Sequence, residues 1–114
     1  RSMRFVAAEL VREQLYMKLR QELPYQIAVT VEHWEESESG SVTIYATIHV
    51  ARESHKGMVI GKGGAGLKHV GTRARHGIEE LLERPVFLDL KVRVQTRWMD
   101  DVKALRRLGY HEET

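Results

Sequence analysis

One glycine-rich segment limits the folds open to this chain. Residues 57–66 read GMVIGKGGAG, so that half of the ten positions are glycine. Glycine adopts positive φ angles at no steric cost and lets another backbone or a ligand come close. Three phosphate-binding loops have such a composition: the P-loop of nucleotide hydrolases, the dinucleotide-binding fingerprint and the GxxG loop of RNA-binding domains. Each loop requires different elements around it, so the rest of the chain decides between them.

The chain before this segment predicts one helix and a β-hairpin. Apolar residues at steps of three and four predict an amphipathic helix over residues 5–19, ending before Pro24. They are Phe5, Ala8, Val11, Leu15 and Leu19. Residues 27–32 and 42–50 alternate as strands do, and the polar residues 35–41 between them predict a turn. In the second strand one face is predicted to be buried and the other to be wetter. The side chains predicted to face the core are Val42, Ile44, Ala46, Ile48 and Val50.

The chain after the segment predicts a helix, a third strand and a final helix. Apolar positions at helical spacing run to about Glu83 and predict a helix that covers the sheet; they are Leu67, Val70, Ala74, Ile78 and Leu81. Gly71 and Gly77 inside this helix cost roughly 1 kcal/mol each relative to alanine, which predicts close packing at both positions. Pro85 opens an alternating strand over residues 86–95. Acidic residues at 100–101 and arginines at 106–107 suit the dipole of a short C-terminal helix.

Spacing excludes one of the three loops and weakens a second. A P-loop requires GxxxxGK[ST], in which the hydroxyl holds magnesium, but Gly57 and Gly61 are one residue too close and Gly63 replaces the hydroxyl. Gly61, Gly63 and Gly66 do match the dinucleotide pattern GxGxxG, with Glu79 or Glu80 near the distance expected for a ribose contact. That fingerprint belongs to a parallel βαβ unit, whereas here a hairpin precedes the segment.

The third loop fits its surroundings. Residues 55–60 predict a short helical turn, Gly61-Lys62-Gly63-Gly64 the loop, and Ala65 the start of the next helix. The segment VIGKGG in this setting resembles a KH domain, whose GxxG loop clamps nucleotide backbone. The order of elements is that of the bacterial type II KH domain, α-β-β-α-α-β. The predicted fold class is therefore α+β, with a three-stranded mixed sheet packed on helices and a short C-terminal helix.

Four further segments narrow the resemblance. AAELVREQL, ELPY, ESHKGMVIGKGGAGLKHVGTRAR and DDVKALRRLGY occur in an order that resembles the C-terminal KH domain of the Era family of GTPases. We therefore divide the chain into a linker or expression remnant at residues 1–4, a KH domain at 5–110 and a disordered tail at 111–114.

The Era resemblance implies partners and a place in the cell. The implied partners are single-stranded RNA, namely the 3′ end of 16S ribosomal RNA, and the 30S ribosomal subunit during its assembly. GTP and magnesium would bind the parent protein's N-terminal GTPase domain, which this chain lacks, so we expect no cofactor and no catalysis here. The resemblance also allows peripheral membrane association of the parent protein, and we expect the chain in the cytoplasm.

Candidate RNA-binding residues follow from the loop. Its glycines would let the RNA backbone approach and would expose main-chain N–H groups, aided by the positive end of the following helix. Gly61, Lys62, Gly63 and Gly64 form the loop, and Lys56, Ile60, Lys68 and Arg73 are further candidates. As a KH domain the chain would hold about four unpaired nucleotides over an apolar floor. Val59, Ile60 and Leu67 are the candidates for this floor, although core packing explains them equally well.

Composition fits this interpretation without proving it. The chain of 114 residues fits one domain, and its net charge of +2 alone is too small to indicate a nucleic-acid partner. However, residues 54–76 hold five lysines and arginines and no carboxylate, whereas residues 32–38 hold four acids. No cysteine occurs, and His69 and His76 lack the spacing of a helical metal pair. Three alternatives stay open: a KH module of a ribosomal protein or RNA chaperone, a dinucleotide-binding fragment, and a protein-interaction domain.

Overall fold

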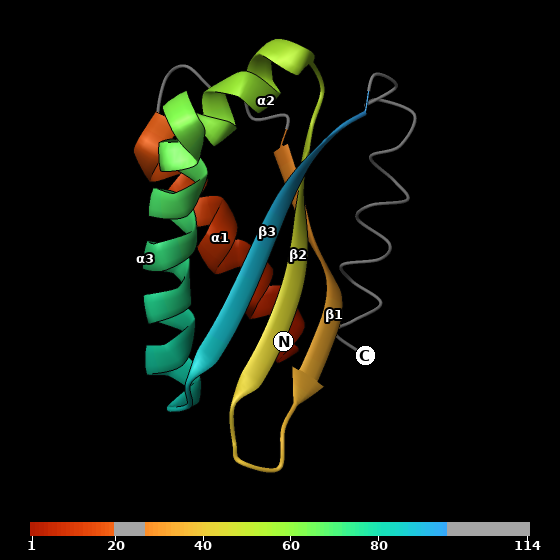
Figure 1. Cartoon of the computed structure of the whole chain (residues 1–114). Coiled ribbons are helices and arrows are strands. Elements are labelled where there is room, and N and C mark those ends of the chain that lie inside the picture. Colours follow the sequence, from red (N-terminus) through yellow and green to blue (C-terminus); the bar gives the residue numbers. More distant parts are fainter. Residues whose placement is uncertain (20–26, 96–114) are drawn as a thin grey trace.

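The order of elements in the structure is that of a type II KH domain. The computed structural model describes residues 1–19 and 27–95. The elements are α1 (Met3–Leu19), β1 (Ile27–Glu36), β2 (Val42–Val50), α2 (Glu53–Ile60), a 3-10 turn η2 (Lys62–Gly64), α3 (Ala65–Leu82) and β3 (Val86–Val94) (Figure 1). The predicted order α-β-β-α-α-β is therefore confirmed. The predicted C-terminal helix, the tail at 111–114 and Pro24 lie outside the described residues.

The sheet has three strands in the order β1-β2-β3 and is mixed, as predicted. β1 pairs with β2 antiparallel, and β2 pairs with β3 parallel. Because parallel strands need a crossover, the chain between them forms α2 and α3. Helices α1 and α3 lie together on one face of the sheet, and α2 lies across the end where β2 finishes (Figure 1). The glycine-rich segment therefore lies at the end of the molecule opposite the β1–β2 hairpin.

The core lies between the sheet and the two long helices. The inward side chains of β2 are at most 2% exposed, which confirms the alternation predicted for this strand. Val11 and Leu15 of α1 meet them together with Val70 and Ala74 of α3. Ile78, further along α3, packs with Val42, Ile44 and Val86 at the hairpin end. The apolar side of each long helix therefore packs on the apolar face of the sheet.

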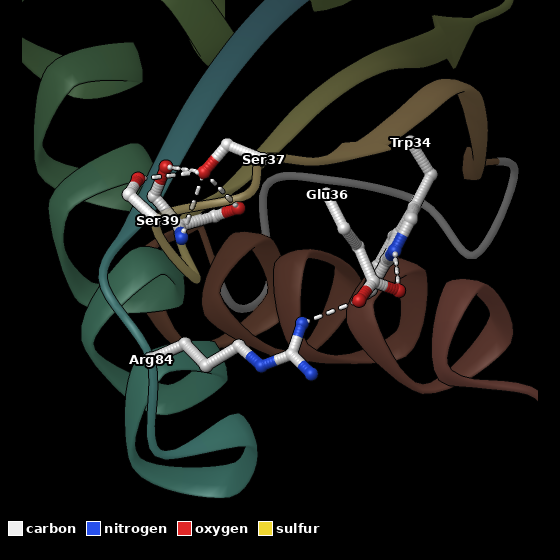
Figure 2. Close-up of polar contacts among 6 residues, drawn as sticks. Trp34, Glu36, Ser37, Ser39 and Arg84 are labelled. Atoms are coloured by element: carbon white, nitrogen blue, oxygen red, sulfur yellow. Dashed lines mark hydrogen bonds and ion pairs between the residues drawn. The ribbon is translucent and has the colours of Figure 1, made fainter.

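Two predicted ends differ from the structure. Helix α1 begins at Met3, two residues before the predicted start, and the Phe5 N–H donates to the Ser2 hydroxyl at 3.2 Å as in a helix cap. β1 continues to Glu36, so the predicted turn is shorter at its start. The Glu36 carboxylate accepts hydrogen bonds from Trp34 and Arg84, as Figure 2 shows, which ties the end of β1 to the residues before β3. The polar end of β1 stays in the sheet because its pairing with β2 continues to Glu36, opposite Val42.

Two predictions about burial are wrong. Leu81 is 50% exposed, because Leu82, one residue later, packs against the cluster formed by Ile78 and Val86. Thr47 and His49 lie on the sheet face predicted to be wetter, yet they are 1% and 4% exposed. The central position of β2 does not by itself bury this face, because Tyr45 on the same face is 41% exposed. His49 Nε2 lies 2.8 Å from the Thr30 hydroxyl oxygen, so this ring nitrogen keeps a hydrogen bond although it is buried.

Candidate nucleic-acid interface

The glycine loop joins two helices through a left-handed backbone. Gly61 ends α2 with φ +72°, and its N–H donates to the Gly57 carbonyl at 2.9 Å. Gly63 and Gly64 follow with φ +62° and +80°, and α3 begins at Ala65 as predicted. Side chains other than glycine rarely adopt such angles. The sequence therefore needs glycine at three of the four loop positions for the backbone alone.

The same glycines face different surroundings. A Cβ atom at Gly61 would lie 2.9 Å from the backbone nitrogen of Gly66, and a Cβ at Gly66 would lie 2.8 Å from the Val59 carbonyl oxygen. Gly61 and Gly66 therefore bring the backbones of α2 and α3 together. A Cβ at Gly63 or Gly64 would have no atom of the described residues within 4 Å. The outer half of the loop is thus open to a ligand, and the inner half is packed.

Gly66 was missed as part of the site. Sequence reasoning used it only to test the dinucleotide pattern, although a glycine at the second position of the predicted helix is a signal of close backbone packing. Main-chain donors are also fewer than expected. The N–H groups of Gly64 and Ala65 donate to the carbonyls of Gly61 and Lys62, so these two amides are used within the turn.

Three lysines surround the loop. Lys62 and Lys68 are exposed and Lys56 is half-buried, and none of the three forms a salt bridge with the part of the chain that the structure describes. The two arginines of the predicted cluster are already engaged. Arg73 Nε donates to the Gln14 side chain of α1 at 3.2 Å, and Arg75 pairs with Glu79 at 3.1 Å.

The apolar candidates divide into core and surface. Val59 is 1% exposed and belongs to the core, so it can support a binding surface but cannot present one. Ile60 is half-buried at the end of α2, and Leu67 is half-buried and packs against the core from the first turn of α3. Leu90, Val92 and Val94 of β3 are half-buried beside them, and sequence reasoning did not select these three. Alternation predicted a strand here but not which residues would be partly open. They are half-buried in β3, which lies at the sheet edge and contacts α2 and α3.

A comparison with known families identifies this arrangement. The sequence pattern of the KH domain family matches residues 22–99, most of the chain. The chain belongs to the KH domain family. Within it the chain is of the Era type, because it is 55% identical over 111 residues to the GTPase Era of Nitratidesulfovibrio vulgaris, strain Miyazaki F. The Era of Sinorhizobium medicae is 48% identical over 107 residues.

Solved Era structures share the fold of this KH domain. An Aquifex aeolicus Era variant bound to GDP and AlF4⁻ superposes with a TM-score of 0.86 at 38% identity over 96% of this chain. A second Era structure, in complex with MgGDPNP and nucleotides 1506–1542 of 16S ribosomal RNA, has the same TM-score and identity. The chain spans 36% of the length of the Nitratidesulfovibrio relative and 37% of each of these structures.

The described residues offer few other sites. They contain no group of three or more histidine or carboxylate side chains placed to hold a metal ion. None of their helices has the length and apolar character needed to cross a membrane. The glycine loop of this Era-type KH domain is therefore the feature on which a function can be argued.

Proposed function

We propose that this KH domain binds single-stranded RNA at the glycine loop, as the RNA-binding domain of an Era-type GTPase. The open space outside Gly63 and Gly64, between two helix ends and beside three lysines, is the observation that supports this most directly. A nucleotide backbone can approach such a surface more closely than it can approach any side chain. The Era structure that contains 16S ribosomal RNA provides independent support.

Charge and shape would hold the RNA backbone. Lys62 projects from the loop itself, and Lys56 and Lys68 lie in the adjoining turns of α2 and α3. Each can neutralise a phosphate and release its counterions. Arg73 can join them only by exchanging its hydrogen bond to Gln14, so we assign it a smaller role. Because two loop amides are already paired, lysines rather than main-chain donors would supply most of the attraction.

The bases would lie against the half-buried apolar residues next to the loop. Ile60 ends α2 and Leu67 begins the buried face of α3, with the inner residues of β3 beside them. A KH domain holds about four unpaired nucleotides in this way. The close packing predicted at Gly71 does not require glycine, because a Cβ there would meet a Leu90 methyl group of β3 at an ordinary 3.6 Å. Val59 would act from beneath as a packed support.

The RNA target is a finer part of the proposal. A relative seen with nucleotides 1506–1542 of 16S ribosomal RNA supports the 3′ end of the small-subunit RNA as target. Binding there would place the domain on the 30S subunit during assembly, in the cytoplasm, carried by a GTPase domain that binds GTP and magnesium. A GTPase domain encoded upstream in the parent gene would support this carrier, and its absence would favour another protein that uses a KH module.

The dinucleotide alternative is not favoured by the geometry. The fingerprint requires a loop between a strand and the helix that follows it, so that the pyrophosphate meets the helix N-terminus. Here α2 separates β2 from the loop, and Gly66 serves the contact between two helices. Titration with NAD should therefore leave the amide spectrum of the protein unchanged.

An RNA titration tests the proposed function. The labelled chain would be titrated with a short single-stranded RNA that ends in a pyrimidine-rich tail complementary to purine-rich messenger leaders, and amide shifts would be followed. We expect saturable shifts centred on residues 57–75 that weaken as salt rises. The Lys62→Asp, Gly63→Asp double variant should lose them. Aspartate tolerates the left-handed angle of Gly63, and its side chain would meet open space, so this variant should fold.

A matched control separates local from overall charge. Lys91→Asp with Ser39→Asp changes the net charge equally, on the sheet and in the hairpin turn, away from the loop. This control should bind RNA nearly as the wild type does. Equal binding by wild type and loop variant, or equal loss in both variants, would contradict the loop as the RNA site.

A further inference from the structure

Three aromatic rings form a row across the sheet face that points away from α1 and α3, at its hairpin half. His33 of β1, Tyr45 of β2 and Phe87 of β3 supply one ring each. Ring centroids lie 5.7 Å apart between His33 and Tyr45 and 6.1 Å apart between Tyr45 and Phe87, in tilted and edge-to-face arrangements. Tyr45 is 41% exposed and Phe87 is 56% exposed. Large exposed apolar side chains that touch one another are a mark of interaction surfaces.

Strand register builds this row. A bulge between Val31 and His33 shifts the pairing so that His33 stands opposite Tyr45 on the outer face. Phe87 faces the same way, because it pairs with Thr43, two residues before Tyr45. The three rings are held by the backbones of three strands, so a partner would find them already in place. Preorganisation of this kind reduces the entropy cost of binding.

Carboxylates surround the rings at the hairpin half of this face. Asp89 pairs with Tyr45 in the parallel register, and Glu35 Oε1 lies 3.9 Å from His33 Nε2. Glu32, at the bulge, accepts a hydrogen bond from the Thr30 hydroxyl on the same face. Lys91 and Arg93 carry positive charge on this face further along β3, where they pair with Thr47 and His49. The aromatic row therefore lies in a locally acidic surface.

We propose that this aromatic row, defined as His33, Tyr45 and Phe87 with Glu35 and Asp89, docks an arginine-rich protein segment. Guanidinium groups stack on exposed aromatic faces and pair with carboxylates, and the row offers both within one surface. An RNA strand fits poorly, because its phosphates would meet the carboxylates. The strand register places the row on the sheet face opposite the core residues and towards the hairpin, away from the glycine loop. The inference therefore does not rest on the proposed RNA function.

A synthetic peptide in which arginine alternates with glycine tests the proposal on the whole chain. We expect saturable shifts at residues 33, 43–45 and 87–89. The Tyr45→Ser, Phe87→Ser variant should bind the peptide about tenfold more weakly, since two stacking faces are lost. The Leu81→Ser, Met17→Ser variant removes apolar side chains of similar exposure, 50% and 54%, from the helices and should bind as the wild type does.

Charge is tested separately from stacking. A peptide with citrulline in place of arginine keeps the planar shape without the charge and should not bind. Asp89→Asn with Glu35→Gln should weaken the arginine peptide, whereas Glu9→Gln with Glu80→Gln on the helices should not. The proposal is overturned by equal binding to the ring variant, by binding of the citrulline peptide, or by the absence of any saturable shift. It is also overturned if single-stranded RNA, rather than the peptide, shifts the amide signals of these residues and if those shifts disappear in the Tyr45→Ser, Phe87→Ser variant.

Discussion

Gly61 and Gly77 differ in what one added methyl group would do. Gly61 has φ +72°, and a Cβ there would lie 2.9 Å from the Gly66 nitrogen. Gly61→Ala should therefore lower the free energy of unfolding by more than about 1 kcal/mol. Gly77 is inside α3, and its Cβ would contact the Leu10 methyl groups at an ordinary 3.9 Å. Gly77→Ala should raise the free energy of unfolding by roughly 0.5–1 kcal/mol. Urea unfolding of both variants measures this, and destabilisation by Gly77→Ala would show that α1 and α3 pack too tightly for a methyl group.

His49 is a titratable residue that the proposed functions do not use. Burial lowers its pKa below the ordinary 6.5, against a smaller upward effect of Gln95 and Glu32, and Lys91 and Arg93 lower it further. The Thr30 hydroxyl donates to Glu32, so its oxygen accepts from His49 Nε2–H, and burial rather than this hydrogen bond favours the neutral ring. A lowered histidine pKa contributes stability above pH 6.5 that is lost as the pH falls towards the lowered value. Unfolding free energy should drop between about pH 7.5 and pH 5.5, and this drop should shrink in His49→Gln.

Elements were predictable where the periodicity of the sequence matched the geometry of a whole element. The limits of β2 and β3 agree with the predicted limits to within one residue. Strict alternation defines each strand, and Gly40 and Pro85 mark where the strands can begin. Side chains at element ends were less predictable. Leu81 fits the helical pattern as well as Leu82 does, and only the packing at the end of α3 selects Leu82. The burial of His49 depends on its contact with Thr30, nineteen residues away, which no local pattern contains.

Glu79 joins the end of α3 to the start of β3. Its carboxylate accepts the Val86 N–H at 2.8 Å and pairs with Arg75, and the first of these contacts is the main reason that its pKa lies below the ordinary 4.5. The stabilisation is present above pH 4.5 and is lost as the pH falls through the lowered value. Glu79→Gln should be less stable than wild type at neutral pH and should lose less stability on acidification, whereas Glu80→Gln should follow wild type. Parallel acid-unfolding curves for Glu79→Gln and wild type would contradict this link.

Charge over the whole molecule is divided between two ends. Lys56, Lys62 and Lys68 lie around the glycine loop, and the carboxylates of β1 lie on the hairpin half of the sheet. The sequence predicted this division, since the two charge runs are separate along the chain. The sequence did not predict which of the basic side chains already have a partner among the described residues. Arg73 and Arg75 belong to the same run as Lys62 and Lys68, but their partners come from the packing of α1 and from the turn spacing of α3.

The dependence of RNA affinity on salt should report this division. For single strands the logarithm of the association constant falls with the logarithm of salt concentration by roughly 0.7 for each neutralised phosphate. If Lys56, Lys62 and Lys68 each hold one phosphate, the slope should be near −2, and each lysine changed to glutamine should reduce it by about 0.7. Arg73→Gln should change it less, because Gln14 already occupies that side chain. Lys91→Gln, on the sheet face, should leave the slope unchanged although it alters the net charge equally. A slope that falls by the same amount in all five proteins would mean that RNA senses the overall charge, and the glycine loop would then have no special place in binding.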